Sequence, residues 1–251
     1  MTDKIKVKVS SFVSNILEND ALRFGFMKNG KANKNALLNK LIPTLVEVRK
    51  ARRNEIENIL KNEYNREDSE DIYNAVNTVI DRVYFNDEEL NVLDEYIWIR
   101  PSKETMSTYD EIETSETLIT AQETPVYIRG LLNEYSRLPQ YKREILTFDR
   151  ELEIFAEACD TRKILHFKDK ESGKRYKVFA FGYYYGYLYD QTNYCIVYDI
   201  NNKKIKAIPL YNIQDIYTIK QKYKPSEKLM KQLQEYVELC DFDKEISVEV
   251  E

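Results

Sequence analysis

The strongest candidate for binding chemistry lies at the start of the chain, in the stretch KIKVKV at residues 4–9. A lysine and an aliphatic residue alternate there three times. Successive side chains of a strand point to opposite faces, so the pattern predicts a strand with one ammonium face and one apolar face. Three ammonium groups in a row suit anionic ligands, above all phosphates. The lysines are Lys4, Lys6 and Lys8.

Catalytic motifs are not found in this sequence. It contains no phosphate-binding glycine loop, no nucleophile elbow and no H-E-x-x-H, and it has only six glycines. The single histidine, His166, lies in the predicted strand KILHFK and is expected to be a packed strand residue. We therefore expect a protein that is not an enzyme and needs no cofactor.

The cysteines and the acidic C-terminal stretch are weak candidates for a metal site. Three cysteines without C-x-x-C spacing, Cys159, Cys195 and Cys240, are expected to be small buried apolar residues. Near the C-terminus the alternating acids Asp241, Asp243 and Glu245 fit either a divalent ion or a solvated acidic segment, and the second interpretation is the commoner one. We expect no metal.

Length and charge set the broad class. The chain has 251 residues, 43% of them hydrophobic, which is enough for a sizeable core. No signal pattern or membrane-spanning run is present, so we expect a cytoplasmic protein with no membrane partner. Residues 1–61 carry 13 Lys/Arg against 6 Asp/Glu, residues 62–125 carry 4 against 17, and residues 162–224 carry 13 against 5. Two basic segments thus flank an acidic one, and they either bind anions or neutralise the acidic segment within the fold.

The elements that would position the lysine strand follow it directly. A strand cannot satisfy its own backbone hydrogen bonds, so this one needs a pairing partner. Helical spacing predicts helices over 12–26 and 34–60, the second capped by Asn33 and broken or kinked by Pro43. Further helices are predicted over 69–85, 88–99, 126–138 and 140–159, with a Ser/Thr/Glu-rich linker near 102–124.

Beyond residue 161 the period changes from helical to alternating. Five short strands are predicted, with turn sequences between them, followed by a helix over 226–240. Five strands in so short a segment favour a small barrel of the Sm or SH3 type, because a flat sheet would expose both edges. The predicted strands cover 163–168, 175–186, 193–199, 203–210 and 212–219.

The expected fold class is therefore α+β with four parts. A strand-helix-helix module (1–61) is followed by an acidic helical region (62–160), a five-stranded barrel (161–224), and a C-terminal helix with an acidic tail (225–251).

The order of strand, helix, NGKAN loop and helix in residues 1–61 resembles a ribbon-helix-helix module. The resemblance implies a homodimer in which the first strands of two chains pair and present their lysines to nucleic acid. It also implies that the start of the second helix, near Lys31, Asn33 and Lys34, holds a backbone phosphate. The alternative is an edge strand whose lysines guard against aggregation.

The segment ILHFK…NIQDI resembles the WYL domain, an Sm-like barrel. The naming Trp-Tyr-Leu triplet falls on Asn193, Tyr194 and Cys195, and the two arginines of the next family motif are absent from residues 208–213. The resemblance implies a pocket for anionic ligands or nucleic-acid ends, in which Arg175, Lys177 and Lys206 replace those arginines by charge, with Tyr185 beside them. The alternating tyrosines of 183–189 would stack on unpaired bases or pack within the protein.

Taken together, the helices of 126–159 and the strand-helix-helix start resemble the WYL accessory proteins of type VI CRISPR loci. The resemblance implies a non-catalytic RNA-binding protein that modulates a CRISPR effector. Two alternatives stay open: a DNA-binding transcriptional repressor with a ligand-sensing WYL domain, and a protein-protein interaction module that docks on an effector.

Overall fold

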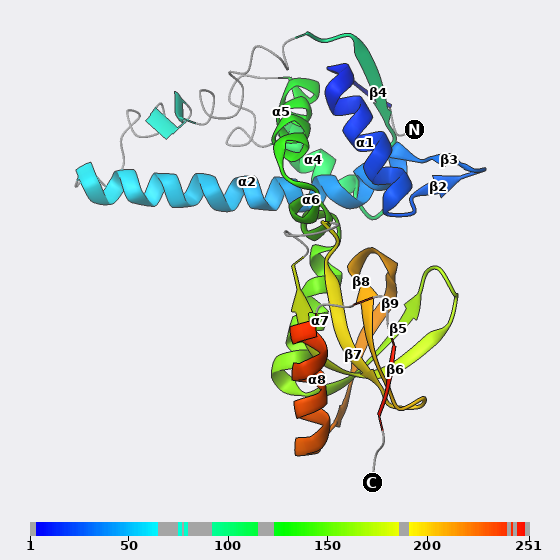
Figure 1. The fold of residues 1–251 in the computed structure, drawn as a ribbon. Coiled ribbons are helices and arrows are strands. Elements are labelled where there is room, and N and C mark those ends of the chain that lie inside the picture. Colours follow the sequence, from blue (N-terminus) through cyan, green and yellow to red (C-terminus); the bar gives the residue numbers. More distant parts are fainter. Residues whose placement is uncertain are drawn as a thin grey trace. The chain divides into compact units, whose positions relative to one another are not determined.

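The computed structural model describes most of the chain, as two compact units. The described residues are 4–64, 75–76, 78–79, 92–114, 123–185, 191–239, 242 and 245–248. The units comprise Met1–Leu138 and Pro139–Glu251, and Figure 1 shows the elements of each. The class is mixed α+β, as expected, with seven α-helices among the described residues.

The first unit combines a two-stranded sheet with helices. A tight hairpin, β2–β3, turns at Asn29 and Gly30, whose φ angles are 52° and 75°. Both are left-handed, as an Asn-Gly hairpin turn requires. The elements are β1 (Ile5–Val9), α1 (Ser11–Arg23), β2 (Met27–Lys28), β3 (Lys31–Ala32), α2 (Lys34–Tyr64), β4 (Glu95–Ile99), α4 (Met106–Thr114) and α5 (Thr124–Arg137).

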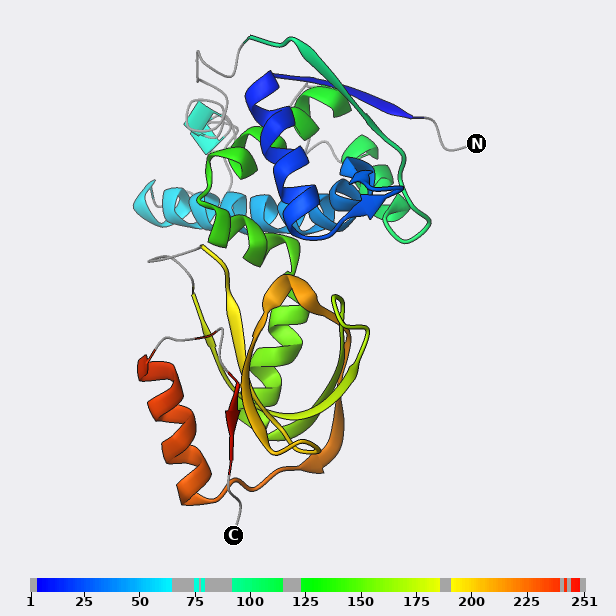
Figure 2. The same ribbon diagram turned by 45° about the vertical axis from the view of Figure 1, so that its right-hand side comes forward.

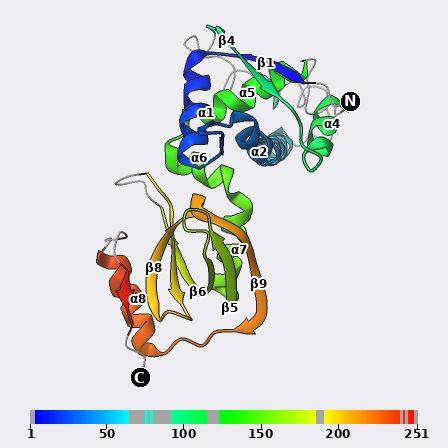
Figure 3. The ribbon, with the colours of Figure 1, turned by 90° about the vertical axis from the view of Figure 1, so that its right-hand side faces the viewer.

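The predicted lysine strand is β1, and its partner is β4 of the same chain. The two strands are antiparallel, with Lys6 opposite Trp98 and Lys8 opposite Tyr96. We call this pair of strands the ribbon; Figure 3 shows it lying over α1 and α5. Its inner face is apolar and fully or almost fully buried, and each such aliphatic side chain contributes roughly 1.5–3 kcal/mol to folding. The buried residues are Val7, Val9, Ile97 and Ile99.

Helices α1 and α5 pack against the inner face of the ribbon. α1 begins at the cap Ser10, whose hydroxyl accepts a hydrogen bond from the backbone of Val13. α5 packs against β1 and against α1. Within this interface the hydroxyl of buried Tyr135 donates to the carboxylate of buried Asp20 at 2.8 Å. A buried carboxylate needs such a partner, so the contact fixes the distance between the two helices.

Pro43 does not break α2, which runs continuously from Lys34 to Tyr64. A proline inside a helix costs about 3 kcal/mol. Aliphatic side chains on both sides of it are buried, and their combined burial outweighs that cost. These side chains are Leu37, Leu38, Leu41, Ile42, Leu45 and Val46. A break at Pro43 is therefore wrong, and the other predicted possibility, a kink, stays a prediction.

Two other sequence predictions in the first unit need correction. Residues 95–99 were expected in a helix and form strand β4, because the alternating residues of EYIWI cover the core on one side only. Part of the expected linker forms helix α4, which begins after Thr105, a residue hydrogen-bonded to Asn39 of α2. The predicted helix 69–85 lies almost entirely outside the described residues.

The second unit carries one six-stranded antiparallel sheet between helices. The strand order is β10-β8-β7-β6-β5-β9. All five predicted strands are present, and β10 adds a sixth. The elements are α6 (Gln140–Thr147), α7 (Asp149–Thr161), β5 (Lys163–Asp169), β6 (Arg175–Tyr184), β7 (Tyr194–Asp199), β8 (Lys204–Pro209), the short 3-10 helix η2 (Leu210–Asn212), β9 (Ile213–Lys222), α8 (Glu227–Leu239) and β10 (Ile246–Ser247).

The sheet is bent, as Figure 2 shows, but it does not close into a barrel. Within the described residues β9 and β10 are its two end strands. The predicted closure is therefore corrected: within the described residues the sheet stays open between β9 and β10, and α7 and α8 cover its faces.

Helices cover the two faces of this sheet. α8 packs on one face, where Leu229, Leu233 and Tyr236 join Phe179 and Tyr198 in a buried cluster. α7 packs on the opposite face, against β5, β6 and β9. No helix within the described ranges has the length and apolarity needed to cross a membrane.

Candidate nucleic-acid interface

The outer face of the ribbon combines cations with aromatic rings. Lys4, Lys6 and Lys8 are exposed on this face. β4 contributes Tyr96 and Trp98, which are 51% and 52% exposed although both are large and partly apolar. Exposed aromatic side chains of this size are usually available for a ligand or a partner.

The strand register places every lysine of β1 beside a ring of β4. The ammonium nitrogen of Lys6 lies 3.8 Å from the ring centroid of Tyr96 and 5.3 Å from that of Trp98. Lys4 approaches Trp98 at 5.8 Å, and Lys8 approaches Tyr96 at 5.8 Å. Each exposed cation–π contact contributes about 0.5–1 kcal/mol, so the lysines are held close to the rings without being neutralised.

Each end of the ribbon is anchored to a helix start. At one end, Asp94 accepts hydrogen bonds from the backbone and the hydroxyl of Ser11, at 2.7 and 2.8 Å. The bond from the Ser11 hydroxyl lowers the pKa of Asp94. At the other end, the backbone N–H of Arg100 donates to Asn35 at 2.7 Å, and its carbonyl accepts from Asn39 at 2.9 Å. The strands thus present their outer face from a fixed frame.

Among the described residues, the ribbon lysines form no ion pair, although the charge of Lys8 contributes to the lowered pKa of Asp94. Within the described residues, no carboxylate lies within ion-pair distance of Lys4, Lys6 or Lys8, whereas Lys34 pairs with Glu18 at 3.1 Å. Three unneutralised ammonium groups beside two exposed rings can bind an anion and a flat ring at the same time. This is the combination that phosphate and base of an unpaired nucleotide require.

The three residues predicted at the second helix start behave differently from one another. Asn33 caps α2, as predicted, accepting from the backbone of Ala36 at 3.2 Å. Lys31 is exposed on the β2–β3 hairpin. Lys34 is bound to Glu18 and to the hydroxyl of Ser14, so it is less available for a phosphate. The contact of Arg100 with Asn35 places the start of α2 next to one end of the ribbon.

The structure adds a strand partner that the sequence analysis did not name. The register shows β1 paired with β4 of its own chain, and Ile97 and Ile99 of β4 complete the buried apolar face of the ribbon. The predicted pairing with a second copy stays a prediction. Within the described residues β4 occupies one edge of β1, so pairing with a second copy would have to use the other edge.

The anion pocket predicted in the second unit is not brought together as one site. Lys206 lies between Ile205 and Ala207, which contact the cluster under α8, so Lys206 points to the other face of the sheet. Arg175 and Lys177 alternate with buried Val178 and share the face of Phe179, on the α8 side. The replacement cations therefore lie on opposite faces.

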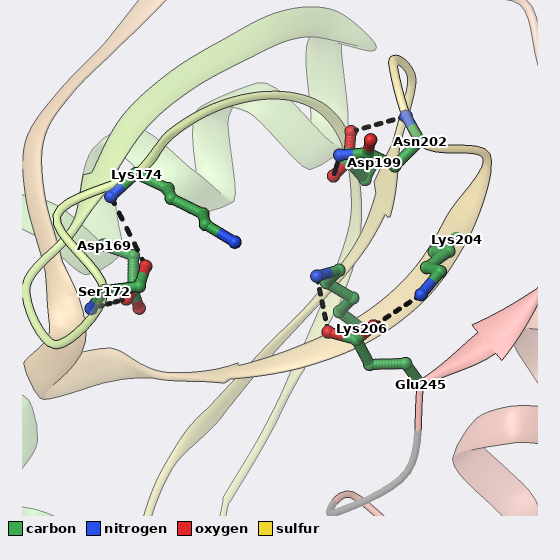
Figure 4. A network of polar contacts seen from close by, with 8 residues as sticks. All are labelled: Asp169, Ser172, Lys174, Asp199, Asn202, Lys204, Lys206 and Glu245. Atoms are coloured by element: carbon green, nitrogen blue, oxygen red, sulfur yellow. Dashed lines mark hydrogen bonds and ion pairs between the residues drawn. The ribbon is translucent and has the colours of Figure 1, made fainter.

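Lys206 is also occupied by the chain itself. Glu245, next to β10, lies 2.5 Å from the Lys206 ammonium and 3.0 Å from that of Lys204 (Figure 4). Hydrogen bonds from Lys206 and Lys204 lower the pKa of Glu245. Burial is the largest single influence and alone would lower the pKa of Lys206, but the hydrogen bonds and charge interactions with Glu245 and Tyr176 together outweigh it and raise that pKa.

The other residues predicted in this pocket are packed or paired. Asn193 is buried and donates through its backbone and side chain to Glu144, at 2.9 and 2.8 Å. Tyr194 packs against the α8 cluster, and burial raises the pKa of Cys195. Tyr185 contacts the ring of Tyr183 edge-on at 5.0 Å. The later tyrosines of this segment, 187 and 189, lie outside the described residues.

The other titratable candidates are either packed or outside the described residues. Burial raises the pKa of Cys159 to about 12, so its thiolate is scarce at neutral pH. Cys240, Asp241 and Asp243 lie outside the described residues. Within the described ranges no three His, Cys, Asp or Glu side chains are grouped to hold a metal.

Sequence reasoning missed Tyr96 and Trp98 because it assigned their segment to a helix. The signal that could have found them is the alternation in EYIWI, which matches that of IKVKV residue for residue in burial.

The fold and the ribbon define a two-unit α+β protein with a cationic, aromatic surface. Comparisons with known proteins find a similar fold but no related sequence. No protein-family model matches the sequence, and no curated protein matches it. A solved structure described as that of a CRISPR Cas-related protein has a similar fold, with a TM-score of 0.58 at 12% identity. The match covers 92% of this chain and 66% of that chain, so this chain spans just under two thirds of that protein's length.

Proposed function

We propose that this protein binds nucleic acid through the outer face of the ribbon, as a non-catalytic accessory of a CRISPR-type effector. The observation that carries the proposal is the close approach of Lys4, Lys6 and Lys8 to the exposed rings of Tyr96 and Trp98. The fold similarity to a CRISPR Cas-related protein supports the cellular context.

Unpaired RNA is the ligand class that this surface favours. Rings can stack only on bases whose faces are open, and each such base contributes about 1–3 kcal/mol. A duplex-reading ribbon instead needs hydrogen-bonding side chains that reach base edges in the groove. The outer face of the ribbon carries lysines and aromatic rings instead, which weakens the alternative of a DNA-binding repressor.

The WYL-like assignment of residues 161–224 is part of this proposal. It rests on the resemblance in sequence and gains support from the five strands found in the expected segments. In this proposal the second unit is a regulatory part without catalysis. The homodimer stays a prediction, which a measurement of the molar mass of the protein in solution would test.

The test compares two triple variants of the full chain. Lys4→Ala, Lys6→Ala and Lys8→Ala together should weaken binding to single-stranded RNA by at least about tenfold. They should also reduce the slope of log affinity against log salt by about two, because each phosphate contact contributes about 0.7 for a single strand. The control combines Lys224→Ala, Lys228→Ala and Lys231→Ala, which remove the same charge from exposed positions elsewhere and should change the slope little.

Fluorescence gives an independent readout of the same site. Trp98 is the only tryptophan of the chain, so quenching on addition of RNA reports on the ribbon alone. Unchanged affinity and slope in the ribbon variant would overturn the site. A preference for duplex DNA would replace the proposal by the repressor, and no binding at low salt would replace it by a protein-interaction module.

A further inference from the structure

A second group of cations and rings lies in the second unit, on the three strands β9, β5 and β6. The register pairs His166 with Tyr217 on one side and with Lys177 on the other, so the three form one row across the strands. Lys168 is paired in the same way with Gln214 and Arg175, forming the next row. We call these six residues the cationic sheet face: His166, Lys168, Arg175, Lys177, Gln214 and Tyr217.

This face is partly exposed where the two rows lie, because Arg175 and Tyr217 are exposed and the other four residues are half-buried. Lys177 lies on the same face of the sheet as Phe179, which belongs to the buried cluster under α8. The residues of the two rows are not part of that cluster. Figure 3 shows α8 beside β8, whereas β9 lies at the opposite end of the sheet. α7 covers the opposite face, where Cys159 of α7 is close enough to Cys195 to affect its pKa. Tyr217 is accordingly 47% exposed.

The two rings of the upper row already form a stack. His166 and Tyr217 are parallel within 10°, with ring centroids 5.3 Å apart. β9 is an end strand of the sheet, so within the described residues no strand lies against the ring face of Tyr217 that points away from His166. An aromatic ligand could extend the stack there. Burial, and then the charge of Lys177, lower the pKa of His166.

The cations of this face form no ion pair with any described residue. In the part of the chain that the structure describes, no carboxylate lies within ion-pair distance of Lys168, Arg175 or Lys177. By contrast Lys163, at the start of β5, pairs with Glu157 at 2.7 Å. The nearest acidic residue along β9, Asp215, is exposed at a bulge of the strand.

We propose that the cationic sheet face is a second binding surface for single-stranded nucleic acid, separate from the ribbon. An unpaired base stacks on Tyr217, and neighbouring phosphates bind Lys168, Arg175 and Lys177. Charge complementarity favours this ligand, because the face carries three cations beside an open ring. Arg175 in addition offers the planar fork that binds phosphate through two hydrogen bonds.

Two side chains that occur once in the sequence allow the two surfaces to be observed separately. His166 is the only histidine and Trp98 the only tryptophan. The imidazole proton resonances of the full chain therefore report on the sheet face, and tryptophan fluorescence reports on the ribbon. The probe is an oligouridylate of about ten nucleotides, within the length that one such surface covers.

We expect the oligouridylate to shift the His166 resonances and to quench Trp98. Replacing Lys168, Arg175 and Lys177 together by Ala should abolish the shift at the same RNA concentration while Trp98 is still quenched. Tyr217→Ala should raise the RNA concentration needed for half of the shift by about five- to hundredfold, and Tyr217→Phe, which keeps the ring, should change it little.

The outcomes separate this inference from the proposed function. Quenching of Trp98 without a shift of His166 overturns the sheet face and leaves the ribbon intact. A shift of His166 without quenching supports the sheet face and overturns the ribbon. A shift by polyglutamate as large as that by oligouridylate at equal charge concentration would identify an acidic protein as the ligand and overturn the inference.

Discussion

The sequence Lys-Ile-Lys occurs twice, where Lys4 leads into β1 of the ribbon and at the start of β8, and its charges are used in different ways. In the ribbon, Ile5 is half-buried while Lys4 and Lys6 lie on the outer face beside aromatic rings. In β8, the isoleucine is fully buried, and Lys204 and Lys206 share the carboxylate of Glu245. Equal sequences thus produce one surface with available charge and one with neutralised charge.

The neighbouring strand decides this difference. Opposite residues on antiparallel strands lie close enough to interact directly. β4 places Tyr96 opposite Lys8 and Trp98 opposite Lys6, whereas β10 follows directly after Glu245. A ring attracts an ammonium group without cancelling its charge, whereas a carboxylate cancels it. A basic stretch of sequence therefore indicates an anion site only when its cross-strand neighbours are known.

The largest expected effect comes from breaking the inner face of the ribbon. Val7 is fully buried in this chain, so Val7→Asp would bury a carboxylate without a partner and should lower the free energy of unfolding by at least about 3 kcal/mol. The measurement is urea unfolding followed by the fluorescence of Trp98, which reports on the first unit.

Lys6→Asp is the matched control, because it introduces the same residue one position away on the exposed face. It should change the free energy of unfolding by less than about 1 kcal/mol. Equal losses in the two variants would contradict the assignment of the faces.

The positions of most of these strands could be predicted from the sequence, because the alternation of apolar and polar residues along a strand is a local property. The alternation in IKVKV predicts β1, and the alternating segments after Lys163 predict β5 to β9. The partners could not be predicted. Both β4 and the contact of Glu245 with β8 depend on pairing between segments that are distant in the chain, and no local pattern states which strands meet.

Two residue assignments show the same limit. The sequence pattern of residues 88–99 predicts a helix that includes EYIWI, so the predicted site lacks Tyr96 and Trp98. Arg175, Lys177 and Lys206 were grouped by charge, but the alternation along β6 and β8 places them on opposite faces of the sheet. Face assignment needs the register, which the structure supplies.

A smaller effect is expected from making the ribbon resemble β8. Tyr96 lies opposite Lys8 and 3.8 Å from the ammonium of Lys6, so Tyr96→Glu would place a carboxylate among the lysines and remove a stacking ring. Affinity for single-stranded RNA should fall by about tenfold or more, measured by fluorescence anisotropy. Tyr96→Phe keeps the ring and should bind like the unmodified protein; equal affinities of the two variants would show that the ring plays no part.

The smallest effect concerns the carboxylate that neutralises β8. Because the pKa of Glu245 is lowered from its usual value of 4.5, its ionised form stabilises the attachment of β10 above that pH. The stabilisation is lost as the pH falls through the lower pKa of the folded state. The amide of Val248, which donates to Lys203 at 2.9 Å, reports on this attachment through hydrogen exchange. Near pH 6 the amide should exchange roughly two- to fivefold more slowly than in Glu245→Gln, since a largely exposed ion pair contributes little. Near pH 3, well below 4.5, the two proteins should exchange alike, and a difference that persists there would mean that the charge of Glu245 does not hold the strand.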